Sequence, residues 1–189
     1  CDAESLTQMT ANQTAFTAAG FTLKSGDTVD LNALRARLTE LGYLCTEQVD
    51  GPGQFAVRGG IVDVFSPAHE KPARLELWGD EIDLLSYFST EDQRRSDPLS
   101  ELTVLPACEF FYNPAELAQQ LLKKAGALKK ANEAYLRQLR QDAELLQAGG
   151  TVCADRYLPY LKNKPVLPGD YFKNCLLVCS EQKNISQRL

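Results

Sequence analysis

The spacing of apolar residues changes several times along the chain, and each spacing predicts a different element. Residues 1–20 are polar and rich in threonine and alanine without a clear period, so we expect an irregular or weakly helical N-terminal segment. The next apolar residues recur at helical spacing: Leu31, Leu34, Leu38 and Leu41. Asp30 suits the N-cap of this helix and Gly42 the left-handed residue after its last turn.

Strand character follows. Apolar, β-branched and aromatic residues gather in five short runs, at residues 43–49, 54–58, 61–66, 73–78 and 82–88. Turn residues at 50–53 and 79–81 join the first two and the last two runs, in lengths that suit antiparallel hairpins. We therefore predict an α+β fold over residues 27–106, in which one helix packs on an antiparallel meander. Residues 1–26 are assigned to a preceding segment.

A helix start signal opens a second region, which we assign to residues 107–189. Asn113 suits the N-cap, Pro114 the first helical position, and Glu116 can return a bond to the cap. Leucines and one tyrosine then recur at threes, fours and sevens up to the glycines at 149–150, which predicts one long helix with Gly126 as its weakest point. Short apolar runs at 151–154 and 175–179 predict two buried strands.

The amino-acid composition and net charge argue against several kinds of binding site. With 189 residues, 44% of them hydrophobic and 24% charged, the chain can build a core. A formal net charge of −5 opposes general attraction to nucleic-acid phosphates, and the lysine pairs of the long helix are diluted by acidic residues. The six cysteines are scattered and form no C-x-x-C pair, and His69 is the only histidine, so we expect reduced thiols and no metal.

The ends of the sequence and the lengths of its apolar runs bear on the cellular location of the protein. No apolar run approaches the roughly 20 residues that span a bilayer, and no signal peptide is recognisable at the start. These features predict a cytoplasmic protein without a membrane partner. Because the chain starts at Cys1 and stops at Leu189 just after a predicted strand, we expect it to be part of a longer protein.

Catalytic patterns are not found. No G-x-x-x-x-G-K-[ST] phosphate loop occurs, so we expect neither ATP hydrolysis nor a bound cofactor in this piece. His69 lies in a turn-like segment without a nucleophile pattern, and we interpret it as a surface loop residue. Asp80 and Glu81 fall in a predicted hairpin turn, where carboxylates keep the turn soluble. The sequence therefore predicts no catalytic residues.

Alternation along the strands predicts a set of surface groups instead. It points both leucines of residues 74–78 into the core, and Arg74 and Trp78 toward solvent. Arg58 points outward at the end of an earlier strand, beside the glycines at 59–60. Tryptophan and arginine are enriched at the energetic centres of protein interfaces.

A structural interpretation explains the same pattern equally well. Arg74 could pair with Glu76 or another nearby carboxylate, and Trp78 could cover the sheet or pack under the second region. The pattern of strand residues does not decide between an interaction patch and internal packing.

The same residues carry a family resemblance. The segments PGQFAVRGGIVDVFSP and PARLELWGDEIDLLSYFSTEDQR resemble the UvrB-homology region of bacterial transcription-repair coupling factors. The likeness extends upstream through DTVDLNALRARLTELGY and downstream through TVLPACEFF to GDYFKNCLLV. UvrB proteins share the RG pair and the GDEI turn, but they usually have an acidic residue at the position of Gly60. Gly60 and the VDVF stretch favour the coupling factors.

The resemblance implies a docking role. It implies that residues 27–106 are similar to the family's second domain, a small α+β module that recruits UvrA, and that the rest is similar to half of a degenerate helicase-like domain. The family's contact residues correspond to Arg58, Arg74 and Trp78, the last of which is often phenylalanine in relatives. The resemblance also implies that this surface is masked in the resting full-length protein by a C-terminal domain.

Other activities of the family fall outside this chain. The whole protein is implied to be a DNA translocase that uses ATP and magnesium and binds RNA polymerase and double-stranded DNA through domains beyond Leu189. Two alternatives stay open: a piece of a UvrB-like excision-repair ATPase, which would need a phosphate loop upstream, and a scaffold of this fold that binds another protein at the cell envelope.

Overall fold

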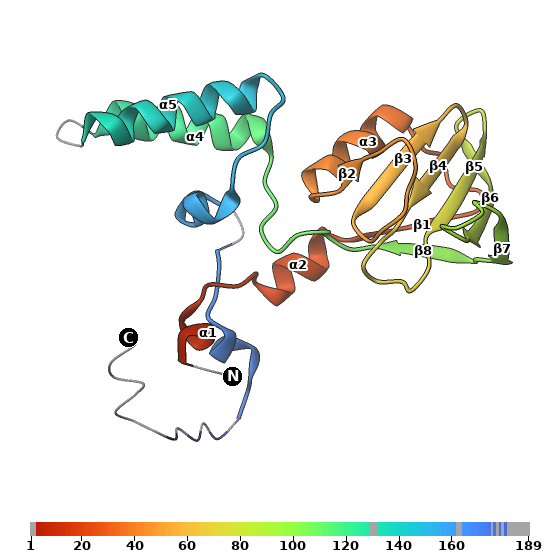
Figure 1. Cartoon of the computed structure of the whole chain (residues 1–189), viewed down its shortest axis with the longest axis horizontal. Coiled ribbons are helices and arrows are strands. Elements are labelled where there is room, and N and C mark those ends of the chain that lie inside the picture. Colours follow the sequence, from red (N-terminus) through yellow and green to blue (C-terminus); the bar gives the residue numbers. More distant parts are fainter. Residues whose placement is uncertain are drawn as a thin grey trace.

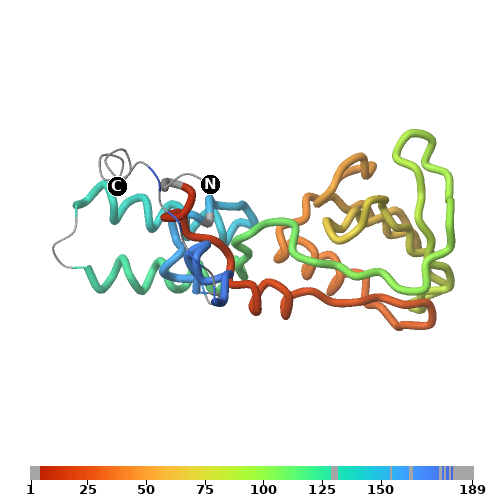
Figure 2. The backbone as a smooth tube through the Cα atoms, turned by 90° about the horizontal axis from the view of Figure 1, so that it is seen from below, coloured from red at the N-terminus to blue at the C-terminus, as the bar shows by residue number. Residues whose placement is uncertain are grey.

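The computed structural model of the chain describes residues 3–128, 132–161, 164–174, 176, 178 and 180. It has two lobes, one built on a β-sheet and the other on a pair of helices (Figure 1). Seen from the perpendicular direction, the molecule is elongated and the lobes lie at its opposite ends (Figure 2).

The sheet lobe confirms the predicted α+β class. Its main sheet has six strands in the order of the chain: β2 (Leu44–Cys45), β3 (Gln54–Arg58), β4 (Ile61–Val64), β5 (Ala73–Trp78), β6 (Glu81–Phe88) and β7 (Arg95–Pro98). Neighbouring strands from β3 to β7 are antiparallel. Helix α3 (Leu31–Glu40) packs on one face of this sheet, which we call the inner face.

Helix α3 forms as its sequence predicts. The side chain of Asp30 accepts hydrogen bonds from the N–H groups of Asn32 and Ala33, so the N-cap is confirmed. Gly42 follows the helix with a φ of +86°. Leu34 and Leu38 are buried and meet the apolar side chains that alternate along the inner face of the sheet.

Strand β2 differs from the prediction. We expected residues 50–53 to form an antiparallel hairpin between the first two strands, but β2 runs parallel to β3, with Leu44 opposite Gln54. The reason is that β2 ends at Cys45, and residues 46–53 carry the chain back to the level at which β2 began. The side chain of Gln54 closes this loop by accepting bonds from the N–H groups of Asp50 and Gly51.

A second, two-stranded sheet was not predicted. Strand β1 (Phe21–Lys24) pairs antiparallel with β8 (Glu101–Val104), so residues that we placed in the N-terminal segment belong to the sheet lobe. Leu23 and Leu102 lie opposite each other and are buried in the main core. A run of four residues is too short for its alternation to be recognised without the partner strand.

The helical lobe corrects the prediction of one long helix. Helix α4 (Pro114–Ala127) and helix α5 (Glu133–Gln147) are separate and lie side by side as an antiparallel pair (Figure 1). Each has its own asparagine N-cap, Asn113 and Asn132. The leucine spacing continued across the break because both helices bury an apolar face of the same kind against each other.

The two strands predicted after α5 are not found where the structure describes the chain. Thr151 to Cys153 form no strand, and the backbone N–H and carbonyl of Val152 bond instead to the hydroxyl of Tyr112. A 3-10 segment, η1 (Ala154–Tyr160), follows. Of the predicted strand at 175–179, residues 175, 177 and 179 lie outside the described residues, while Leu176 and Val178 are exposed and unpaired.

Segment η1 is fastened to the helical lobe by a buried pair. Tyr157 donates a hydrogen bond to Asp142 of α5, which also accepts one from Gln138. Burial, together with the bond to Asp142, raises the pKa of Tyr157 well above its usual value. Loss of this proton therefore opposes the packing of η1 on α5.

The first described helix lies near a segment that is far from it in the sequence. Helices α1 (Ala3–Thr7) and α2 (Gln13–Ala19) precede the sheet lobe, and α1 contacts η2 (Pro168–Tyr171). Thr10 and Val166 exchange backbone hydrogen bonds of 2.8 and 3.0 Å. Among the residues described, no helix is long and apolar enough to cross a membrane.

Candidate protein-interaction site

The outer face of the sheet lobe, opposite helix α3, carries the predicted site residues. Residues directly opposite each other on paired strands share a face. Two rows cross this outer face, one of Ala56, Asp63, Arg74 and Ser86 and the next of Arg58, Ile61, Glu76 and Leu84. Trp78 follows Glu76 by two residues on β5, and alternation places it on the same face.

Asp63 joins the two arginines of this face. Its carboxylate is fully buried, and both of its oxygens accept hydrogen bonds. Arg74 donates from Nε to Oδ1 at 2.7 Å and from Nη2 to Oδ2 at 2.9 Å, and Arg58 donates from Nη2 to Oδ2 at 2.5 Å. The site therefore has a carboxylate at its centre that the sequence analysis did not identify.

Arg74 lies on the predicted face of the sheet but is not open to solvent as predicted, because its side chain is only 12% exposed. Its Nη1 donates to the carbonyl of Gln93 at 2.9 Å, and its guanidinium lies 4.5 Å from the ring centre of Phe88. The hydrogen bond to Asp63 raises the pKa of Arg74 above its usual value. The structural interpretation is thus confirmed for Arg74, with Asp63 as its carboxylate.

Two chain segments cover this part of the outer face. Val49, in the loop after β2, is buried with Ala56, Phe65 and Phe88 in a small second core. The turn at residues 89–94 closes through hydrogen bonds between Ser89 and Arg94 and between Gln93 and Ser89. Because these segments fold over the sheet, the side chains of Asp63 and Arg74 lie beneath them.

Arg58 and Trp78 remain accessible. The Arg58 side chain is 42% exposed, although Nη1 also donates to the carbonyl of Glu47 at 2.8 Å. Trp78 is 84% exposed, so it neither covers the sheet nor packs under the helical lobe. It precedes the predicted hairpin turn, where Gly79 has a φ of +62° and Trp78 pairs with Glu81.

Further residues of the outer face were missed by sequence reasoning. Leu84 is 46% exposed opposite Glu76, and Glu76 itself pairs with Arg95 at 3.1 Å. The signal for Asp63 was present, because a carboxylate between Val62 and Val64 must point away from the face that buries the valines. The signal for Leu84 was hidden by a bulge in the pairing of β5 and β6.

His69 also differs from its interpretation as a surface loop residue. Its Nε2 accepts a hydrogen bond from the N–H of Thr103 at 3.2 Å, and its Nδ1 lies 3.0 Å from the hydroxyl of Tyr87. His69 therefore fastens the segment before β5 to strands β6 and β8. In the described part of the chain, no cluster of histidine, cysteine, aspartate and glutamate is arranged to hold a metal ion.

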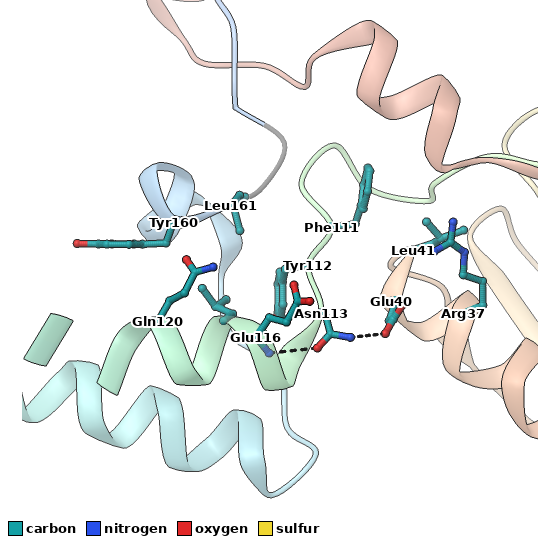
Figure 3. A pocket seen from close by; sticks show the side chains of 11 residues that line it. Arg37, Glu40, Leu41, Phe111, Tyr112, Asn113, Glu116, Gln120, Tyr160 and Leu161 are labelled. Carbon is teal, nitrogen blue, oxygen red and sulfur yellow. Dashed lines mark hydrogen bonds between the residues drawn. The ribbon is translucent and has the colours of Figure 1, made fainter. Parts of the chain in front are cut away.

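The junction between the lobes contains a hollow of about 270 Å³ (Figure 3). Arg37 and Glu40 of α3 line one side, and Asn113 and Gln120 line the other. Asn113 donates to Glu40 at 2.6 Å and accepts from the N–H of Glu116, so its side chain is used in joining α3 to α4 (Figure 3). We therefore interpret the residues that line this hollow as joining the two lobes.

Comparison with known proteins identifies the sheet lobe. A family model described as the UvrB interaction domain matches residues 21–110, from the first residue of β1 to just beyond β8. Residues 21–110 form a UvrB interaction domain. The match includes Arg58, Asp63, Arg74 and Trp78, and it begins at the strand that sequence reasoning left out.

Transcription-repair-coupling factors are among the relatives that this chain matches. That of Bacillus subtilis is 32% identical over 176 residues, covering 87% of this chain and 15% of the relative. That of Mycobacterium tuberculosis is 49% identical over 73 residues, covering 39% and 6%, and that of Escherichia coli 38% over 88 residues, covering 47% and 8%. The predicted resemblance is confirmed, and the chain spans at most 15% of these relatives.

Proposed function

We propose that the UvrB interaction domain of this chain docks the excision-repair protein UvrA through the outer face of its sheet. The observation that carries the proposal is the exposure of Trp78, which is 84% exposed on the same outer face as the partly exposed guanidinium of Arg58. Burial of an exposed indole by a partner lowers the free energy of the complex, and a guanidinium on the same face can direct the contact toward a carboxylate. The family of the domain supports this choice of partner.

The proposal extends to the longer protein that such a domain serves. The named relatives are transcription-repair-coupling factors. We propose that the longer protein is an ATP-dependent DNA translocase of the cytoplasm that acts on stalled RNA polymerase, and that its ATP and magnesium are bound outside this chain. The part contributed by this chain is recruitment of the repair machinery.

Titration of the purified chain with UvrA tests the docking function. We expect saturable binding that Trp78→Ala and Arg58→Ala each weaken by about 1–3 kcal/mol, because they remove the two exposed groups proposed to meet the partner. Trp78 is the only tryptophan of the chain, so its fluorescence reports directly on this position.

A matched control separates the site from overall charge. Arg140→Ala removes the same charge from an exposed position on helix α5 of the other lobe and should leave binding unchanged. Equal effects of Arg58→Ala and Arg140→Ala, or wild-type affinity after Trp78→Ala, would refute the proposed face.

A further inference from the structure

We infer that Asp63 and Arg74 are positioning residues, which act on docking by holding Arg58, and that the partner itself meets Arg58, Trp78 and Leu84. The inference rests on the docking function proposed above. It divides the predicted site residues into one arginine that touches the partner and one that does not.

Arg74 has little surface left to offer a partner. Nε and Nη2 donate to Asp63, Nη1 donates to the carbonyl of Gln93, and one flat side of the guanidinium faces the ring of Phe88. With its side chain only 12% exposed, contact with a partner would require Arg74 to leave a fully buried carboxylate. A buried charge without its partner is strongly unfavourable, so Arg74 stays where it is.

Arg58 is fixed by the same carboxylate but stays partly open. Its Nη2 is held by Asp63 and its Nη1 by the carbonyl of Glu47, which orients the plane of the guanidinium. No residue that the structure describes accepts a hydrogen bond from Nε of Arg58. Two guanidinium groups share one carboxylate, so a positive charge remains uncompensated at the accessible end of the cluster.

Leu84 supplies a second apolar contact beside Trp78. It lies opposite Glu76 and in the row of Arg58, and it is 46% exposed. The bulge between β5 and β6 lets Ile82 and Leu85 both face the core, which leaves Leu84 on the outer face. The chemistry that fits this surface is an apolar recess with a carboxylate at its edge.

A double-mutant cycle on UvrA binding tests the division of roles. In the wild-type background, Arg58→Gln, Arg74→Gln and Asp63→Asn should each raise the dissociation constant about tenfold. In the Arg58→Gln background, Arg74→Gln and Asp63→Asn should change it by less than about twofold, because their effect passes through Arg58. If Arg74→Gln costs the same factor in both backgrounds, Arg74 touches the partner and the inference is wrong.

For Asp63→Asn, the direction of the change in UvrA affinity distinguishes positioning from net charge. Removing an acidic group beside Arg58 should strengthen attraction to an acidic partner if only net charge mattered. If Asp63 positions Arg58, the same substitution weakens binding. Tighter binding of Asp63→Asn would overturn the inference.

A separate variant controls for the effect of reduced stability on UvrA binding. Val62→Ala removes buried side-chain volume next to Asp63 on the inner face and leaves the arginine cluster untouched. It should destabilise the lobe and yet bind UvrA as wild type does. If Val62→Ala weakens binding as much as Asp63→Asn does, the binding losses reflect general destabilisation and the inference fails.

A measurement on the free chain makes the two proposals distinguishable. Nitrogen-15 relaxation of the Arg58 Nε–H group should show increased side-chain motion in Arg74→Gln and Asp63→Asn. Unchanged motion of Arg58 in both variants overturns the positioning role whatever UvrA does. If Arg58 is ordered by Asp63 but the wild-type chain does not bind UvrA, the docking function itself is wrong and the inference falls with it.

Discussion

At the position of Gly42, both the backbone conformation and the available space favour glycine. Gly42 ends helix α3 with a φ of +86°, a conformation that residues with a side chain adopt only at a cost. A Cβ there would also lie 2.3 Å from the sulfur of Cys108, in the segment that leads to the helical lobe. Gly26 has a similar φ of +88°, but a Cβ at that position meets no atom within 4 Å.

These two glycines form a matched pair for a stability experiment. Gly26→Ala should lower the free energy of unfolding by about 1–2 kcal/mol, because only the backbone conformation is affected. Gly42→Ala should cost about 1–3 kcal/mol more, because Cys108 must also move. Urea denaturation of both variants measures the difference, and equal losses would contradict the close contact at Gly42.

At the scale of elements, the helical lobe depends on one shared apolar face. The buried apolar residues of α4 and α5 belong to a single cluster that also includes Tyr157 and Leu161. Leu121 is 0% exposed within it, while its neighbour Leu122 is 40% exposed. The pairing of the helices, rather than the intrinsic preference of either sequence, therefore supplies most of the stability of this lobe.

The adjacent leucines test that statement. Leu121→Ala should lower the free energy of unfolding of the helical lobe by about 2–5 kcal/mol, because it opens a cavity between the helices. Leu122→Ala changes the same residue type in the same helix, and should cost under about 1 kcal/mol. Thermal unfolding followed by circular dichroism compares them, and similar losses would mean that α4 does not pack through Leu121.

At the scale of the whole molecule, the described part of the chain has two main cores that share no buried residue. The core of the sheet lobe is formed by residues between 23 and 104, and that of the helical lobe by residues between 117 and 161. The junction between them is held by local bonds, among them the bond from Asn113 to Glu40 and the one from the N–H of Ala107 to the carbonyl of Leu41.

We therefore expect the lobes to respond separately to core substitutions. Leu38→Ala should reduce amide hydrogen-exchange protection in the sheet lobe, and Leu139→Ala in the helical lobe, because each residue is fully buried in one core only. In the double variant the losses should add within about 0.5 kcal/mol. Loss of protection in both lobes from either single variant would show that they unfold as one unit.

The sequence by itself determined the elements whose signals are local. Capping by Asp30, the bounds of β3 and β5, and the turn at Gly79 follow from residues a few positions apart, and the structure agrees with them. Alternation also assigned the exposed side of Trp78 correctly. Such features depend on backbone conformation and side-chain period, which neighbouring residues specify.

The tertiary structure decided the features that depend on residues far apart in the sequence. The pairing of β1 with β8, the parallel direction of β2 and the separation of α4 from α5 depend on partners that a local pattern does not contain. Alternation could place Arg74 on the outer face, but not reveal that the turn at residues 89–94 and the ring of Phe88 would enclose it there. Burial is a property of everything that packs around a side chain, and so it is set only when the whole lobe has folded.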